Sequence, residues 1–155
     1  MKIEIGQPAP AFTLHDTEKK EVTLKSLEGK TVLLLFFPLA FTGTCTKELC
    51  SIRDNISAYN NINATVFGIS VDAPPTLAKF KEEQGLNFSL LSDFNKEASA
   101  AYDTLYELLG WMKGVSKRSA FVIDKQGIIQ YKEILEKATD LPDFESIQNI
   151  LKDLR

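Results

Sequence analysis

The chain contains two cysteines, Cys45 and Cys50, and the residues around the first of them are suited to thiol chemistry. An apolar run ends at Pro38, a short loop containing Thr42 follows, and Cys45 comes where a helix is expected to begin. The first turn of a helix offers free backbone N–H groups and the positive end of the helix dipole, which both favour negative charge. Because the thiolate is the reactive form of cysteine, this context predicts that Cys45 is a nucleophile.

The second thiol, Cys50, lies five residues further along the chain. One interpretation is that it attacks oxidised Cys45, so that the two residues form a redox-active dithiol. The alternative is that Cys50 is a small apolar side chain packed in the core, as most free cysteines are. The spacing is not specific, and it differs from the C-x-x-C spacing of thioredoxin-type reductants. Both interpretations of Cys50 therefore stay open on the residues alone.

Other residues near Cys45 or rich in hydrogen-bonding groups are candidates for supporting roles. Pro38 cannot donate to a strand ladder and so ends the apolar strand before the loop. The hydroxyl of Thr42 can accept a hydrogen bond near the thiol and donate one to an oxygen, although Thr42 and Thr44 could also only cap the helix. Arg118 opens a strongly apolar strand, either as a fixed charge near the thiolate or as a solvated strand end. Glu48 could pair with a basic residue or complement the helix dipole.

Composition and charge exclude several classes of protein. A length of 155 residues suggests one domain over residues 1–155, and the content of 44% hydrophobic and 25% charged residues is that of a soluble globular protein. The net charge is −3 without a basic cluster, so we expect no nucleic-acid partner. The longest apolar stretch, 32–41, is too short to span a bilayer, so we expect no membrane partner. The first residues do not resemble a signal peptide, which favours a cytoplasmic location.

The residue types also argue against a cofactor or a metal. Two cysteines and the single histidine, His15, are too few for a typical zinc site. No phosphate-binding loop, Ser-His-Asp set or dinucleotide fingerprint is present. Trp111 and Met112 are expected to be packing residues rather than parts of a cofactor site. We therefore expect no cofactor.

The order of secondary-structure elements predicts an α/β fold. Hydrophobic periodicity and turn residues predict a hairpin of strands at 12–14 and 22–24, and further strands at 31–37, 66–71, 88–91, 118–124 and 128–133. Helices are expected at 44–59, 74–85, 95–102 and 142–154, whereas residues 105–117 show no clear pattern. This order resembles the thioredoxin-like arrangement, a mixed β-sheet flanked by helices on both faces, here with an N-terminal β-hairpin extension. Active sites of open α/β sheets lie at the carboxyl ends of strands, where Cys45 follows the strand 31–37.

The segment Phe36 to Cys45 resembles the P-x-x-x-T-x-x-C active-site motif of the peroxiredoxin family. The likeness covers nearly the whole chain, because the segments 6–12, 68–72, 90–93 and 118–124 are similar to further blocks of that family. Within the family, the string Phe-Phe-Pro-Leu-Ala-Phe-Thr-Gly is similar to the E-type alkyl hydroperoxide reductases. The second cysteine, five residues on, is similar to the Q-type group, also called bacterioferritin comigratory proteins.

The resemblance implies a role for each candidate. Cys45 would be the peroxidatic cysteine, which peroxide oxidises to a sulfenic acid, and Pro38 would shield its loop. Thr42 and Arg118 would help to bind the peroxide oxygens and the thiolate, which favours the charged role of Arg118 over the solvated one. Cys50 would resolve the sulfenic acid as an intramolecular disulfide, as in an atypical two-cysteine peroxiredoxin.

The resemblance also implies the partners of the protein. The substrate would be hydrogen peroxide or an organic hydroperoxide, and thioredoxin or glutaredoxin would be the reductant of a monomer or homodimer. One alternative is a one-cysteine peroxidase in which Cys50 is incidental. A thiol-disulfide oxidoreductase acting on protein disulfides is a second, against which the missing C-x-x-C argues. A non-catalytic thioredoxin-like binding module is a third, against which the intact motif argues.

Overall fold

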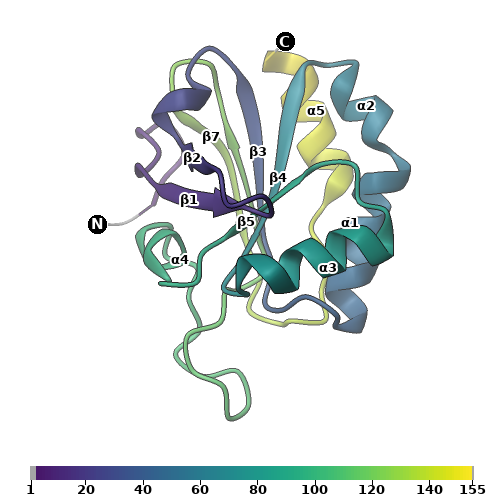
Figure 1. The fold of residues 1–155 in the computed structure, drawn as a ribbon. Coiled ribbons are helices and arrows are strands. Elements are labelled where there is room, and N and C mark those ends of the chain that lie inside the picture. Colours follow the sequence, from purple (N-terminus) through teal and green to yellow (C-terminus); the bar gives the residue numbers. More distant parts are fainter. Residues whose placement is uncertain (1–2, 155) are drawn as a thin grey trace.

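The computed structural model of the protein describes residues 3–154, which contain one seven-stranded mixed sheet of order β2-β1-β5-β4-β3-β6-β7 (Figure 1). Its strands are β1 (Thr13–Asp16), β2 (Glu21–Thr23), β3 (Thr31–Phe36), β4 (Ala64–Ser70), β5 (Ser89–Ser92), β6 (Ser119–Ile123) and β7 (Ile129–Ile134). The helices are α1 (Gly43–Asp54), α2 (Ile56–Asn60), α3 (Pro74–Gln84), α4 (Glu97–Ala101), α5 (Phe144–Leu154) and the 3-10 helix η1 (Lys25–Leu27). The predicted α/β class and the N-terminal hairpin are confirmed.

The central strand, β3, is buried on both faces, as its nearly continuous apolar sequence predicts. It pairs in parallel with β4 and antiparallel with β6, so that Leu34 lies between Phe67 and Phe121. Because β5 also runs parallel to β4, the carboxyl ends of β3, β4 and β5 lie at the same edge of the sheet. The chain leaves β3 at this edge and enters the loop before α1.

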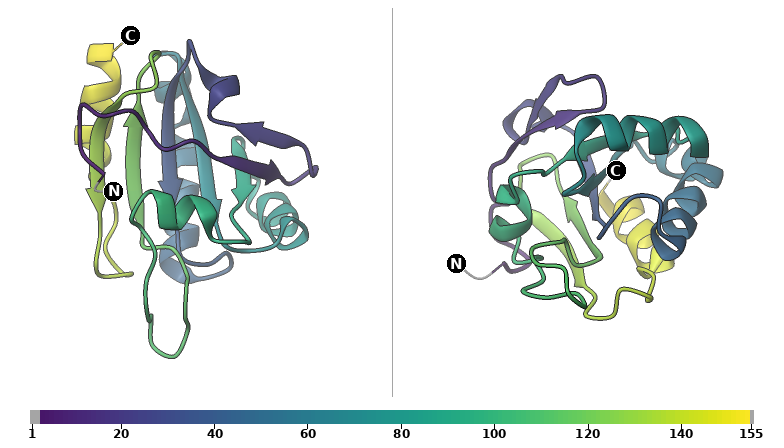
Figure 2. Two further views of the ribbon diagram at one scale, coloured as in Figure 1. Left: turned by 90° about the vertical axis from the view of Figure 1, so that its left-hand side faces the viewer. Right: turned by 60° about the horizontal axis from the view of Figure 1, so that its bottom comes forward.

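Helices cover both faces of the sheet, as predicted (Figure 2). Alternate residues of β3 point to opposite sides, so Leu33 and Leu35 share one core with the apolar residues of α1, α3 and α5. Leu34 and Phe36 belong to the second core, which lies beneath α4 and the N-terminal hairpin. The helix that carries both cysteines therefore rests on the first of these two cores.

The helix predicted at 44–59 is two helices, because the chain breaks at Asn55. The backbone of Asn55 has φ −117° and ψ 19°, and its side-chain amide donates a 2.8 Å hydrogen bond to the carbonyl oxygen of Ser51. Asparagine side chains compete in this way for backbone partners that a continuous helix would use. The apolar periodicity persists across the break, since Ile52 and Tyr59 are buried in the same core.

The last helix begins at Phe144 rather than at Pro142, where proline had suggested the first turn. The carboxylate of Asp143 accepts hydrogen bonds from the Ser146 hydroxyl at 2.7 Å and the Ser146 N–H at 3.1 Å. These bonds hold the pKa of Asp143 below its ordinary value, the hydroxyl bond first. Asp143 therefore caps the helix, and Pro142 lies just before it.

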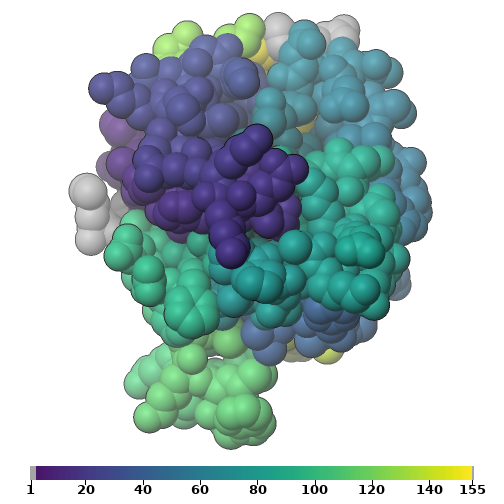
Figure 3. Space-filling model, viewed as in Figure 1, coloured from purple at the N-terminus to yellow at the C-terminus, as the bar shows by residue number. Residues whose placement is uncertain are grey.

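Residues 105–116 form a hairpin that projects beyond the carboxyl edge of the sheet, and Figure 3 shows it standing clear of the body. Leu105 pairs with Ser116 at its base, and Leu109 exchanges two backbone hydrogen bonds with Met112 at its tip. Gly110 supplies the positive φ of 62° that the tight turn requires. The prediction that Trp111 is a packing residue is wrong, because its side chain is 87% exposed.

Gly68, in β4, is where close packing beneath α1 can be tested. A Cβ at this position would lie 2.7 Å from a methyl carbon of Leu90 and 3.3 Å from the ring of Phe37. Both neighbours are fully buried, so we expect Gly68→Ala to lower the free energy of unfolding by about 1–3 kcal/mol in chemical denaturation. Gly43→Ala is the control, because its Cβ would meet nothing within 4 Å. Equal stability of the two variants would mean that Leu90 repacks without cost.

Candidate active site

The loop between β3 and α1 is held from two sides. Pro38 is buried two residues beyond the end of β3 and has no N–H to continue the ladder. The N–H of Ala40 donates to the Asp72 carboxylate at 2.8 Å, and Ser70 donates to the same oxygen at 2.7 Å. Phe41 has a positive φ of 65°, which is rare for a bulky residue, and its ring packs 5.1 Å from that of Phe80. The entry into α1 is therefore fixed by residues at the end of β4 and on α3.

Cys45 is the third residue of α1 and is 1% exposed. Thr42, rather than Thr44, occupies the N-cap position, and its side chain makes no capping hydrogen bond. The Thr42 hydroxyl donates instead to the carbonyl oxygen of Leu39 at 2.8 Å. The Thr42 side chain therefore does not occupy the N–H groups of the first turn, which are left to bind an anion.

Arg118 is buried beside Cys45, so it is not the solvated strand end that its sequence position also allowed. Its Nη2 donates to the sulfur of Cys45 at 3.3 Å and to the carbonyl oxygen of Ala138 at 2.8 Å. Its Nη1 forms a 2.7 Å ion pair with Oε1 of Glu48, which lies one turn further along α1. The structure therefore brings a cation and a thiol into direct contact.

A cavity of about 180 Å³ is lined by Cys45, Arg118 and Thr42 on its polar side. Its apolar lining consists of Pro38, Leu39, Leu109, Met112 and Ala138. Four of the predicted site residues thus surround one cavity, whereas Cys50 is not among its lining residues. Leu109 and Met112 were not predicted as site residues, because the 105–116 hairpin has no hydrophobic periodicity. Ala138 was missed because a backbone acceptor leaves no signal in side-chain types.

Comparison with known proteins agrees with this geometry. Residues 5–132 match the AhpC/TSA family. The chain belongs to this family, the peroxiredoxins. It is 41% identical over 135 residues to alkyl hydroperoxide reductase E of Mycobacterium tuberculosis (strain ATCC 25618 / H37Rv), covering 85% of this chain and 86% of that protein. It is 35% identical over 130 residues to chloroplastic peroxiredoxin Q of Oryza sativa subsp. japonica, covering 84% of this chain and 58% of that protein.

The fold of this peroxiredoxin matches a solved relative over nearly its whole length. The crystal structure of peroxidoxin BcpB from Mycobacterium tuberculosis superposes with a TM-score of 0.87 at 30% identity, covering 99% of each chain. The thioredoxin-like fold is therefore confirmed. Relatives of both the E-type and the Q-type names are similar to this chain, in keeping with its mixed motif.

The two charged side chains closest to Cys45 in the site, Glu48 and Arg118, are buried. The pKa of Glu48 is raised to about 7, chiefly by burial and to a small extent by the charge of Glu133, against the opposing effect of Arg118. Burial alone would lower the pKa of Arg118, but Glu48 and Cys45 outweigh it and the pKa is raised. Oε2 of Glu48 and Nε of Arg118 have no hydrogen-bond partner. Arg118 therefore stays cationic at neutral pH, while Glu48 is poised to exchange a proton.

Cys50 lies outside the cavity, where it is half-buried against α3. Its thiol lies 3.5 Å from the side-chain oxygen of Gln84, and both cysteines are free thiols. Since α1 is helical over both positions, their Cα atoms are about 8–9 Å apart by helix geometry. Bridged cysteines usually have Cα atoms within about 7 Å, so a disulfide requires α1 to change shape.

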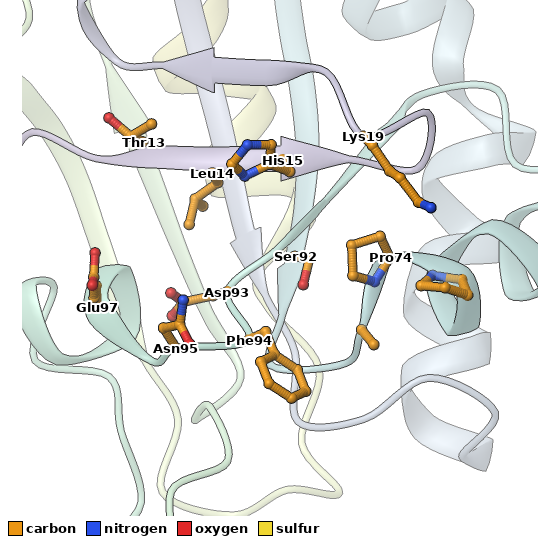
Figure 4. Close-up of a pocket in the computed structure, with 12 residues that line it drawn as sticks. Thr13, Leu14, His15, Lys19, Pro74, Ser92, Asp93, Phe94, Asn95 and Glu97 are labelled. Carbon is orange, nitrogen blue, oxygen red and sulfur yellow. The ribbon is translucent and has the colours of Figure 1, made fainter.

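A second and larger cavity, of about 600 Å³, lies between the β1–β2 hairpin, the β4–α3 loop and the β5–α4 loop (Figure 4). The buried polar groups that line it are hydrogen-bonded to the protein's own backbone. The Asp93 carboxylate accepts from the N–H groups of Ala98 and Ser99, and the Ser92 hydroxyl donates to the carbonyl oxygen of Asp72. No cysteine lines it, so the thiol chemistry belongs to the smaller cavity.

Among residues 3–154, no group of three or more His, Cys, Asp and Glu side chains is placed to hold a metal ion. His15 lies on the exposed side of β1 and lines the larger cavity. In the same range, the helices are too short or too polar to cross a membrane.

Glu48 makes the stability of the fold depend on pH. Its pKa is about 7 in the folded protein and has the ordinary value of 4.5 in the unfolded chain. Between these two pH values the folded state therefore binds more protons than the unfolded state. Its contribution to stability is therefore greatest below about pH 4.5 and falls as the pH rises through about 7. We expect the free energy of unfolding to fall by up to a few kcal/mol over this range, relative to Glu48→Gln.

Urea denaturation at several pH values measures this slope. Glu83→Gln is the control, since Glu83 is an exposed carboxylate on α3 and its removal should leave the wild-type slope intact. A difference between wild type and Glu48→Gln that does not vary with pH would show that Glu48 is ionised throughout.

Proposed function

We propose that this peroxiredoxin reduces hydrogen peroxide and organic hydroperoxides at Cys45. The observation that carries the proposal is the 3.3 Å contact between the buried Cys45 sulfur and Nη2 of Arg118 at the first turn of α1. A fixed cation and open helix N–H groups both favour the thiolate that peroxide reduction needs. The adjoining cavity gives a small substrate access to the sulfur.

The reaction follows from the groups around the cavity. The Cys45 thiolate attacks one peroxide oxygen, so that an S–O bond forms while the O–O bond breaks and Cys45 becomes a sulfenic acid. The departing oxygen takes up a proton and leaves as water or as an alcohol. Arg118 and the helix N–H groups stabilise its developing charge. Because the Thr42 hydroxyl donates to the carbonyl oxygen of Leu39, its own oxygen is free to accept a hydrogen bond from the O–H group of the hydroperoxide.

Pro38 assists by its position rather than by a polar group. It is buried between β3 and the loop and lines the cavity on the apolar side. An apolar neighbour without an N–H donor limits the water that can approach the sulfenic acid and the thiolate. Pro38 therefore acts as the shield that the peroxiredoxin motif implies.

Cys50 resolves the oxidised form in this proposal. Its thiolate attacks the sulfur of the Cys45 sulfenic acid, so that the S–S bond forms while the S–O bond breaks. The departing hydroxide takes up a proton and leaves as water. The first turns of α1 must unwind for this step, and Cys50 must leave Gln84. Local stability is lowest at helix ends, which makes this opening accessible. Thioredoxin or a similar thiol protein then restores both thiols by disulfide exchange.

The nucleophile is tested by Cys45→Ser. We expect this variant to lose peroxide consumption, because a serine hydroxyl is neither ionised by Arg118 nor able to form a sulfenic acid. Stopped-flow mixing with one equivalent of peroxide measures the loss, and Cys50→Ser serves as the matched control that retains the first oxidation. Turnover by Cys45→Ser would place the chemistry elsewhere in the chain.

The role of Cys50 is tested by mass spectrometry without reductant. One equivalent of peroxide should remove two hydrogens from the wild type, as an internal disulfide, and add one oxygen to Cys50→Ser. With thioredoxin as the only reductant, the variant should then stall or over-oxidise. Cycling of Cys50→Ser at the wild-type rate would establish the one-cysteine mechanism, in which Cys50 is incidental.

A further inference from the structure

The last turn of α1 is joined to the end of α3, which lies on the same face of the sheet (Figure 1). Nη1 of Arg53 donates to the carbonyl oxygen of Gln84, the last residue of α3. In the opposite direction, the side-chain amide of Asn87 donates to the carbonyl oxygen of Arg53 at 3.2 Å. We call these three residues the Arg53 clamp. Because it uses one backbone carbonyl of α1 and one of α3, the clamp fixes the two main chains relative to each other.

Arg53 is suited to the position that it occupies. The carbonyl groups in the last turn of a helix have no partner within the helix and carry the negative end of its dipole. Gly85, with a φ of 59°, turns the chain away after Gln84 and leaves that carbonyl open to the guanidinium group. The Asp54 carboxylate binds Nε at 2.9 Å, and this hydrogen bond is the main cause of the raised pKa of Arg53. The guanidinium group is therefore a permanent cation held by two partners.

The clamp also reaches the second thiol. Cys50 lies one turn before Arg53 on the same side of α1, as residues three apart in a helix do. Its thiol donates to the side-chain oxygen of Gln84 at 3.5 Å. Gln84 thus contacts Cys50 through its side chain and Arg53 through its backbone. The clamp therefore holds the part of α1 that carries Cys50 against α3.

The first turn of α1 has weaker local support. The N-cap residue Thr42 makes no capping hydrogen bond. Gly43 occupies the first helical position, where its backbone freedom opposes helix formation. Conversion of Cys45 to the sulfenic acid also removes the thiolate charge that Arg118 contacts. Oxidation therefore loosens the first turn and leaves the clamp unchanged.

We propose that Arg53 is a positioning residue for the resolution step, because it keeps the second half of α1 on α3 while the first turns unwind. This inference rests on the proposed role of Cys50 and adds to it the residue that decides which thiol moves. The oxidised Cys45 travels to Cys50, whose backbone stays in place. Fixing one reaction partner reduces the conformational freedom that has to be lost when the two sulfurs meet.

The bond exchange itself takes place between the two cysteines. The Cys50 thiol gives up its hydrogen bond to Gln84 and its proton to water, and the thiolate attacks the sulfur of the Cys45 sulfenic acid. The S–S bond forms as the S–O bond breaks, and the departing hydroxide takes up a proton and leaves as water. No external oxidant or reductant takes part. The contribution of Arg53 is to hold Cys50 in place.

Arg53→Met tests the clamp in a single oxidation by one equivalent of hydrogen peroxide. Samples are quenched with acid at intervals, and mass spectrometry detects the sulfenic acid as a gain of one oxygen and the disulfide as a loss of two hydrogens. We expect disulfide formation to slow about tenfold in the variant, because the segment that carries Cys50 gains conformational freedom. Sulfenic acid should form at the wild-type rate, since the residues of the clamp do not line the cavity that contains Cys45.

Three further variants separate anchoring from charge. Asn87→Ala removes the neutral part of the clamp and should slow disulfide formation about threefold, although no charge changes. Arg53→Lys keeps the charge without the planar fork and should recover only part of the rate. Lys79→Met is the matched control, because its ion pair with Glu83 stays within α3, and it should form the disulfide at the wild-type rate.

Hydrogen exchange of the disulfide form locates the limit of the unwinding. In the wild type we expect residues 43–52 to lose amide protection and residues 53–60 to keep it. In Arg53→Met the loss should extend into residues 53–60, which a residue that only supports the reduced fold would not cause. Circular dichroism and thermal melting of the reduced variants check that the fold is intact, and Asn87→Ala carries the test if Arg53→Met does not fold.

Three results would overturn the inference. Wild-type rates of disulfide formation in both Arg53→Met and Asn87→Ala would mean that Cys50 needs no clamp, and faster formation would mean that the clamp opposes the step. An equal slowing of both oxidation steps would make Arg53 a general support of the fold. A wild-type protein that stops at the sulfenic acid would instead refute the proposed role of Cys50, which separates the two failures.

Discussion

Arg118 holds together three parts of the structure that the chain keeps far apart. Its guanidinium group contacts Cys45 and Glu48 on α1 and the carbonyl oxygen of Ala138 beyond β7, while its own backbone leads into β6. A buried cation is costly unless charged and polar partners surround it, so these contacts have to form together. Removing any one of them would leave a charge or a polar group without compensation in the core. The position of α1 over the sheet is therefore coupled to the charge balance of the site.

The catalytic loop depends in the same way on elements other than α1. The Asp72 carboxylate, at the end of β4, binds the backbone of Ala40, and Phe41 keeps an unfavourable backbone conformation while its ring rests on Phe80 of α3. Strained residues persist where the surrounding structure determines them more than once. The parallel strands thus place three loops at one edge, and the loop before Cys45 draws its rigidity from its neighbours.

Sequence patterns predicted the features that local rules determine. The nearly all-apolar run 31–37 predicted β3, and Pro74 and Gly85 predicted the ends of α3. The strand-loop-helix context identified Cys45 as the candidate nucleophile. The burial of Arg118 could not be read from its neighbours, because its partners lie 70 and 73 residues away. The 105–116 hairpin was missed because it is stabilised by backbone pairing and contacts at its base rather than by an apolar face. The break at Asn55 was missed because the apolar spacing continues through it.

The exposure of Trp111 has a consequence for optical measurements on this protein. It is the only tryptophan of the chain and lies at the tip of the hairpin, 87% exposed. Unfolding would move its indole ring from water to water, so its emission would report little of the loss of the core. The buried rings of Tyr59 and Tyr102 are better placed to do so, through near-ultraviolet circular dichroism. The indole fluorescence instead senses what touches the hairpin, which makes it a built-in label for any molecule that approaches the catalytic cavity from that side.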